Sequence, residues 1–173
     1  MSFAVWLTGL SGSGKSAIAR ELLSRLQARG LEPAVLESDV MRTQLTPRAS
    51  YSSAERDFFY AALAQLGAHV VARGRPVIFD ATANLRAYRD AARSSIARFA
   101  EVFVDTPLEV CAARDPKGLY RGARDGKSAA LPGVQAAYEP PSAPEVVVHG
   151  DRGTPAEAAA LIADWLAARG WLG

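Results

Sequence analysis

Several features that would place this 173-residue sequence in a specialised class are scarce or absent. Its one cysteine, Cys111, excludes a disulfide within the chain and fits a reducing compartment; we expect it to be a small buried helix residue. No apolar run approaches the ~20 residues of a membrane span, and no basic leader precedes the first apolar stretch. The net charge of +2 gives no overall basic field for nucleic acid. We therefore expect a cytoplasmic protein without membrane or nucleic-acid partners.

The sequence does contain a regular alternation of short apolar runs and segments with helical spacing. No internal repeat or linker interrupts it, so residues 1–173 are expected to form a single domain. We predict strands at 3–7, 33–39, 76–80, 101–105 and 145–149, and helices at 15–30, 53–74, 86–98, 107–114 and 154–170. The alternation predicts an α/β fold, a three-layer sandwich in which helices cover both faces of a parallel sheet.

The segment between the first predicted strand and the first predicted helix reads GLSGSGKS and matches G-x-x-x-x-G-K-[ST] in full. Glycines in such a loop let successive N–H groups point at phosphate oxygens, and the following helix turns its positive end to the same anion. The lysine reaches the β- and γ-phosphates, and the last serine is a ligand for Mg²⁺. We therefore predict a P-loop NTPase fold that binds ATP and Mg²⁺ through Gly9, Ser11, Gly12, Ser13, Gly14, Lys15 and Ser16.

Motifs of other P-loop classes are missing, namely the N-K-x-D guanine motif, the D-x-x-G switch and the ABC signature, and this leaves a small kinase. Residues 114–133 carry five basic and two acidic residues and show no repeat that would bury a face. A loop of that length is uncommon unless it is functional or disordered. We interpret it as a lid that excludes water and in which Arg114, Arg121 and Arg124 stabilise the transferring phosphoryl group. A merely solvated loop is the alternative.

Two carboxylates are predicted at strand ends, the edge of an open parallel sheet where ligands bind. Asp39, at the end of the second strand, is expected to accept the proton of a substrate hydroxyl or to organise Mg²⁺. Asp80, at the end of the third strand, is a second candidate ligand for Mg²⁺. For both residues the alternative is a helix N-cap. His69 and His149 are expected to be structural, because no metal-ligand spacing joins them.

The stretch FVDTPLEVCAARDPKGLYRGAR (103–124) resembles that of adenylylsulfate kinases, which phosphorylate the 3′-hydroxyl of adenosine 5′-phosphosulfate. FAVWLTGL and GLSGSGKS resemble the start of the family, and AYEPPSAPEVVV (137–148) is similar to a later family segment. The similarity spans nearly the whole chain. It implies a five-stranded parallel sheet, Mg-ATP as phosphoryl donor and often a homodimer. It assigns Arg114 and Lys117, in the R-D-P-K-G-L-Y lid motif, to the nucleotide.

The resemblance also assigns the acceptor side. Asp39 matches the last residue of the family's D-G-D, the presumed base or metal-organising group, although the motif is ESD here. Arg42 matches an arginine that holds the anionic end of the substrate, and Arg56 matches the arginine of the family's F-S-x-x-D-R. Tyr51 stands where the phenylalanine of that motif stacks on the substrate adenine.

Departures from the family fall in this acceptor pocket. Phe59 replaces an expected asparagine, Leu131 replaces the second ring of the adenine sandwich, and Ala129 replaces an expected lysine. The family's I-S-P-Y-R is TANLR (82–86) here, which keeps only the final arginine. Losing one stacked ring predicts a roughly ten- to hundredfold lower affinity, and the other losses add to it unless Thr82 or Asn84 substitutes. The acceptor-binding candidates are Asp39, Arg42, Tyr51, Arg56, Phe59, Thr82, Arg86 and Leu131.

Three functional hypotheses follow from these residues. The first is an ATP-dependent kinase that acts on adenosine 5′-phosphosulfate in sulfate assimilation. The second is a kinase of the same scaffold acting on a different small-molecule or nucleotide hydroxyl, because DATANLRAYR (80–89) also resembles the acceptor segment of other small P-loop kinases. The third is a nucleotide-binding regulator without catalysis, against which the intact Lys15, Ser16 and Asp39 argue.

Overall fold

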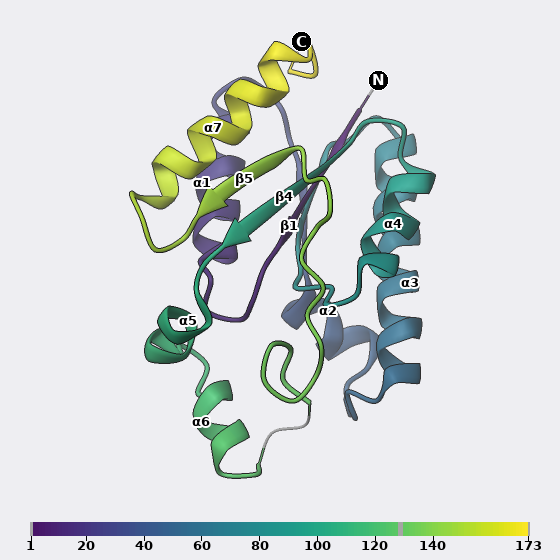
Figure 1. The fold of residues 1–173 in the computed structure, drawn as a ribbon. Helices are drawn as coiled ribbons and strands as arrows, with labels where there is room; N and C mark the ends of the chain where they lie inside the picture. The colour runs from purple at the N-terminus through teal and green to yellow at the C-terminus, as the bar shows by residue number, and fades with distance from the viewer. Residues whose placement is uncertain (1, 128–129, 173) are drawn as a thin grey trace.

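The computed structural model describes residues 2–127 and 130–172. Within them one parallel sheet is formed in the order β2-β3-β1-β4-β5 by β1 (Ala4–Thr8), β2 (Ala34–Glu37), β3 (Val77–Asp80), β4 (Phe99–Asp105) and β5 (Val146–His149) (Figure 1). The predicted five-stranded parallel sheet is therefore confirmed. Because every strand runs in the same direction, all the carboxyl ends meet at one edge, and that edge carries the site.

Helices cover both faces of the sheet, as predicted. Figure 1 shows α1 (Lys15–Gln27) and α7 (Pro155–Ala168) on one face, and α3 (Ser53–Ala72) and α4 (Arg86–Ser95) on the other. Strand β1 contributes side chains to the core on both faces of the sheet, because successive side chains of a strand point to opposite faces. Val5 and Leu7 pack among apolar residues of α1 and α7, whereas Trp6 packs among those of α3 and α4 and stacks on Phe79 with 4.3 Å between ring centroids.

Three shorter helices lie at the carboxyl edge of the sheet: α2 (Ser38–Leu45), α5 (Leu108–Arg114) and α6 (Leu119–Arg124) (Figure 1). The first of them corrects a predicted boundary. Strand β2 ends at Glu37, and Asp39 lies in the first turn of α2 instead of at the end of the strand. A carboxylate is stabilised in the first turn of a helix because the backbone N–H groups there carry partial positive charge.

The segment 114–133 also differs from its prediction, because part of it is helical and buries an apolar face. Tyr120 and Ala123 of α6, together with Leu131, pack with Cys111 of α5 into a small core of their own. The expectation of a segment with no buried face is therefore wrong. The burial of Cys111 in a helix is as expected.

The predicted start of the last helix is confirmed. Helix α7 begins with a capping box in which Glu157 N donates to Thr154 Oγ1 at 3.2 Å and Thr154 N donates to Glu157 Oε2 at 2.7 Å. His69 lies within α3, and His149 ends β5, where its Nδ1 is 3.7 Å from Asp105 Oδ2. No helix among the described residues is long and apolar enough to cross a membrane.

Candidate functional site

The loop of residues 9–14 joins β1 to α1 at the carboxyl edge of the sheet. Gly9 and Gly12 have φ values of 157° and 77°, and a Cβ on Gly12 would stand 2.9 Å from the carbonyl oxygen of Cys111. Only glycine fits such a close approach at positive φ. No side chain caps α1 at its N-terminus, so its first N–H groups are available to an anion.

Lys15 is the charged centre of this loop. Its side chain is buried, and its Nζ donates to the carbonyl oxygens of Gly9 at 2.9 Å and Leu10 at 2.8 Å. Burial lowers the pKa of Lys15 to about 8, although the neighbouring Asp80 carboxylate acts in the opposite direction. An ammonium held among carbonyl groups without a full counter-charge is poised to bind phosphate oxygens.

A cavity of about 940 Å³ opens from this loop across the carboxyl edge of the sheet to the segment 130–132. It brings together most of the residues predicted from the sequence, which are Ser11, Gly12, Gly14, Lys15, Ser16, Asp39, Arg42, Tyr51, Arg56, Asp80, Thr82, Arg114, Lys117 and Leu131. Gly9, Ser13, Phe59 and Arg86 are not among the lining residues. Donor-side and acceptor-side candidates therefore share one cavity.

The start of the segment 114–133, interpreted above as a lid, is bonded to the phosphate loop. The Arg114 guanidinium donates to the carbonyl oxygen of Gly12 at 3.3 Å and to that of Gly150 at 2.6 Å, and Tyr120 Oη donates to Ser11 O at 2.8 Å. Arg114 thus stands beside the loop, as a residue that meets phosphates must. Neither Arg121 nor Arg124, the other two predicted lid arginines, is among the residues that line the cavity.

Asp39 and Lys117 meet across the cavity mouth in an ion pair between the first turn of α2 and the lid. Both side chains are about half exposed. The contact joins a residue assigned to the acceptor with one assigned to the nucleotide, and both residues line the cavity.

The ring of Phe59 packs against the guanidinium group of Arg42. The Arg42 guanidinium carbon lies 3.9 Å from the centre of the Phe59 ring and 4.9 Å from that of Tyr51, and its Nη1 is 3.5 Å from Glu55 Oε1. Phe59 is fully buried and does not itself reach the cavity. Phe59 instead supports Arg42, which does line the cavity, through a cation–π contact.

The remaining acceptor candidates fall into two groups. The Arg56 guanidinium donates to Ala130 O, and so links α3 to the segment of Leu131, whose side chain lines the cavity. Arg86 instead turns away, with its Nη1 donating to Pro140 O at 3.1 Å. Thr82 lines the cavity just beyond β3. Ala129, where the family has a lysine, lies outside the described residues.

The oxygen atoms around Lys15 fit a magnesium ion that is shared with phosphates. Asp80 ends β3 and Ser16 lies in the first turn of α1, and both side chains line the cavity next to Lys15. No cluster of three metal-binding side chains occurs among the described residues. Mg²⁺ needs none, since it is commonly held by one or two carboxylates, water and substrate phosphates.

Among the residues that the sequence did not single out, Tyr60 and Arg89 bear most on the site. Tyr60 lines the cavity from α3, and Arg89, on α4, is completely buried. A signal for the second was present, because Tyr88, Arg89 and Ala92 form the buried face of α4. A charged residue on an apolar helix face requires buried partners.

Comparisons with known proteins agree with this geometry. The sequence model described as adenylylsulphate kinase matches residues 1–149. An adenylyl-sulfate kinase of Synechococcus sp. (strain JA-3-3Ab) is 39% identical over 168 residues, which are 97% of this chain and 96% of that protein. One of Burkholderia ambifaria is 42% identical, over 92% of this chain and 90% of that protein. The solved structure of the Mycobacterium tuberculosis APS kinase in complex with AMPPNP and APS has a TM-score of 0.90 and 35% identity, covering 96% of this chain and 98% of that one.

Proposed function

The chain belongs to the adenylylsulphate kinase family, and from that premise we propose that its cavity transfers the γ-phosphoryl group of ATP to the 3′-hydroxyl of adenosine 5′-phosphosulfate. The product is 3′-phosphoadenosine 5′-phosphosulfate, an intermediate of sulfate assimilation. The observation that carries the proposal is the single cavity that joins the phosphate loop to Arg42, Tyr51 and Leu131. Two ligands in such a cavity can meet with their reacting atoms aligned.

In the donor half, we assign the ATP phosphates to the N–H groups of the loop and to Lys15. The Lys15 ammonium would exchange its two carbonyl partners for the β- and γ-phosphate oxygens, where it neutralises the charge that develops during transfer. Arg114 and Lys117 add positive charge from the lid side. Ser16 and Asp80 would hold Mg²⁺, which would supply positive charge against the phosphates, with Asp39 as a further candidate ligand.

In the acceptor half, Asp39 is the proposed base for the acceptor hydroxyl. Arg42, fixed by Phe59, and Arg56 supply cations for the anionic end of the acceptor. Tyr51, which is 41% exposed, offers a ring for the adenine, and Leu131 lines the same cavity without a second ring. We expect the affinity for the acceptor to be correspondingly modest.

The proposal is tested by a coupled assay with ATP, Mg²⁺ and adenosine 5′-phosphosulfate. Turnover is expected, and Asp39→Asn is expected to lower kcat by about a hundredfold, because an amide cannot accept the hydroxyl proton. Nucleotide affinity, measured by calorimetry without Mg²⁺, should not fall, since the phosphates rest on Lys15 and loss of the Asp39 carboxylate leaves Lys117 available to them. The proposal fails if folded parent protein shows no turnover with this acceptor.

Leu131 and Thr82 favour a second candidate, a kinase of the same scaffold acting on another hydroxyl, because both line the cavity where the chain departs from its family. Thermal-shift screening in the presence of a non-hydrolysable ATP analogue separates the two. Greatest stabilisation by adenosine 5′-phosphosulfate supports the first function, and greatest stabilisation by a different alcohol supports the second. Phosphoryl transfer to any acceptor eliminates a purely regulatory role.

The lowered pKa of Lys15 predicts a pH dependence of nucleotide binding. Only the ammonium form attracts phosphates, and this form is lost in the free protein as the pH rises through about 8. Because bound phosphate favours the ammonium, binding takes up a proton, and ATP affinity should fall about tenfold between pH 7 and pH 9. Isothermal titration in buffers of different ionisation enthalpy measures both effects. An affinity that is constant over this range would contradict the prediction.

We also propose that the chain forms a homodimer in the cytoplasm, as its family resemblance implies. Light scattering coupled to size-exclusion chromatography measures the mass directly. A monomer at micromolar concentration would exclude the dimer and leave the single-chain cavity unaffected.

A further inference from the structure

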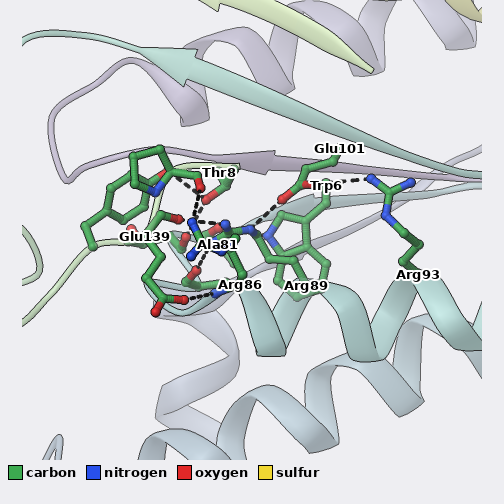
Figure 2. A network of polar contacts seen from close by, with 12 residues as sticks. Trp6, Thr8, Ala81, Arg86, Arg89, Arg93, Glu101 and Glu139 are labelled. Atoms are coloured by element: carbon green, nitrogen blue, oxygen red, sulfur yellow. Dashed lines mark hydrogen bonds and ion pairs between the residues drawn. The ribbon is translucent and has the colours of Figure 1, made fainter. Parts of the chain in front are cut away.

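Residues 81–84, here called the acceptor loop, leave β3 and carry Thr82 and Asn84 to the wall of the cavity. Side chains from elsewhere in the fold bind three of its carbonyl groups (Figure 2). Trp6 Nε1 donates to Ala81 O at 3.0 Å, Thr8 Oγ1 donates to Thr82 O at 2.6 Å, and the Arg89 guanidinium donates to Ala83 O. The position of the loop is therefore set by side chains more than by regular secondary structure.

Ala83 is the strained point of this loop. Its φ is 43°, a left-handed conformation that is costly for any residue with a Cβ, and its side chain is fully buried. Its N–H donates to Tyr60 Oη at 3.1 Å, and its carbonyl oxygen accepts from Arg89. Such a conformation persists only where surrounding contacts hold it, and here they act on both sides of the residue.

Arg89 also joins the acceptor loop to a second segment. Its Nη2 donates to Glu139 O at 2.7 Å, and Asn84 holds the same segment through two further bonds. In these, Asn84 Nδ2 donates to Ala137 O at 2.9 Å, and Glu139 N donates to Asn84 O at 2.7 Å. One buried guanidinium therefore fixes two segments that are distant in sequence.

An acidic residue of the central sheet balances the charge of Arg89. Arg89 Nε donates to Glu101 Oε1 at 2.5 Å, and the other carboxylate oxygen, Glu101 Oε2, is 3.3 Å from Arg93 Nη2. Arg93, one turn farther along α4, makes two bonds, of 2.6 and 2.8 Å, to Glu145, the residue before β5. Figure 2 shows the contacts of Arg89 and Arg93 with Glu101. Arg89 and Arg93 thus share one carboxylate, but only Arg89 touches the acceptor loop.

We propose that Arg89 is a positioning residue for phosphoryl transfer, which holds the acceptor loop so that Thr82 faces the acceptor while Asn84 stays bonded to the segment of residues 137–139. The inference rests on the proposed function for its kinetic consequence. That Arg89 fixes residues 81–84 to residue 139 does not depend on which acceptor binds. A guanidinium is needed because one planar group must donate in three directions at once, which an ammonium of lysine's length and geometry does not reproduce.

The test compares Arg89→Lys with Arg93→Lys. Both variants replace an arginine that pairs with Glu101 by a lysine, so the chemical change is the same. Arg89→Lys is expected to raise KM for the acceptor about tenfold or more, while the Kd for ATP stays within about twofold, because the phosphate loop is untouched. Hydrogen exchange at the amides of Ala83 and Glu139 should accelerate at least about tenfold. Arg93→Lys should leave the acceptor KM and both amides within about twofold, whatever its effect on melting temperature.

The outcomes separate this inference from the proposed function. Unchanged acceptor KM and unchanged exchange in Arg89→Lys, or an equal rise of KM in Arg93→Lys, would overturn it. If the parent protein does not turn over adenosine 5′-phosphosulfate, the proposed function fails, and the exchange of Ala83 and Glu139 still decides the positioning role.

Should Arg89→Lys not fold, Thr8→Val tests the same loop through another carbonyl group. Thr8 is fully buried, does not line the cavity and is nearly isosteric with valine. This variant is expected to raise the acceptor KM about threefold to tenfold without a change in ATP affinity. An unchanged acceptor KM would show that the held carbonyl groups do not position the acceptor, and would overturn the inference.

Discussion

Replacement of Lys15 by methionine is expected to lower the rate of phosphoryl transfer by about a thousandfold. Methionine fills nearly the same volume, but it places no charge where the γ-phosphoryl group passes to the acceptor. Single-turnover measurement with saturating ATP isolates the chemical step from binding. The nucleotide should still bind, more weakly, through the N–H groups of the loop and the start of α1.

The same variant should not lose stability. The Lys15 ammonium is buried and its pKa is lowered to about 8, below that of an unfolded lysine, so the charged form disfavours folding at neutral pH. At pH 7 the melting temperature of Lys15→Met is expected to equal or exceed that of the parent protein. A rate within tenfold of the parent, from protein that is fully folded, would remove Lys15 from the centre of the mechanism.

Replacement of Gly150 by alanine is expected to abolish measurable nucleotide binding, with an affinity loss of about a hundredfold or more. An added Cβ would stand 1.8 Å from Ser13 O and 2.5 Å from Thr106 Oγ1, which itself donates to Ser13 O at 2.9 Å. Backbone atoms cannot yield as a flexible side chain does, so the phosphate loop must shift. The melting temperature should also fall, by about 5–10 °C.

Gly67→Ala provides a matched control for this effect. Its Cβ would stand 2.0 Å from Cζ of Phe79, whose ring is buried and stacked on Trp6, so a similar loss of stability is expected in the core. Because that clash lies away from the phosphate loop, the folded Gly67→Ala protein should bind ATP with the affinity of the parent. If Gly150→Ala binds ATP as tightly as Gly67→Ala does, the loop does not depend on this packing.

The order of strands and helices could be predicted because it is encoded locally, in apolar runs and capping residues such as Thr154. The end of β2 could not, since Ser38 and Asp39 suit a strand end and a helix start equally well until α2 packs. Helix α6 was missed for a related reason. Six residues are too few to establish a helical period, and the partners of Tyr120 and Ala123 include Cys111 of another helix.

In the candidate site, too, one part could be predicted from local sequence and another could not. The phosphate loop is one contiguous motif whose backbone geometry follows from its glycines, and Lys15, Ser16 and Asp80 line the cavity together as expected. The acceptor side is built from distant pairs. That Phe59 supports Arg42, and that Arg86 turns to Pro140, depends on how α2, α3 and α4 pack, which no local pattern specifies. Arg89 was overlooked because its partners lie on β4 and near residue 139.

The ion pair between Lys117 and Asp39 bears on how binding of the nucleotide affects the acceptor side of the cavity. A single ammonium serves as counter-ion either to this carboxylate or to incoming phosphates, but not fully to both. If Lys117 binds the nucleotide and Asp39 is the base, as proposed, a nucleotide that draws Lys117 to itself would leave the Asp39 carboxylate unpaired and ready to accept the proton of the acceptor hydroxyl. Binding of the nucleotide would then prepare the acceptor side of the cavity through the movement of one side chain.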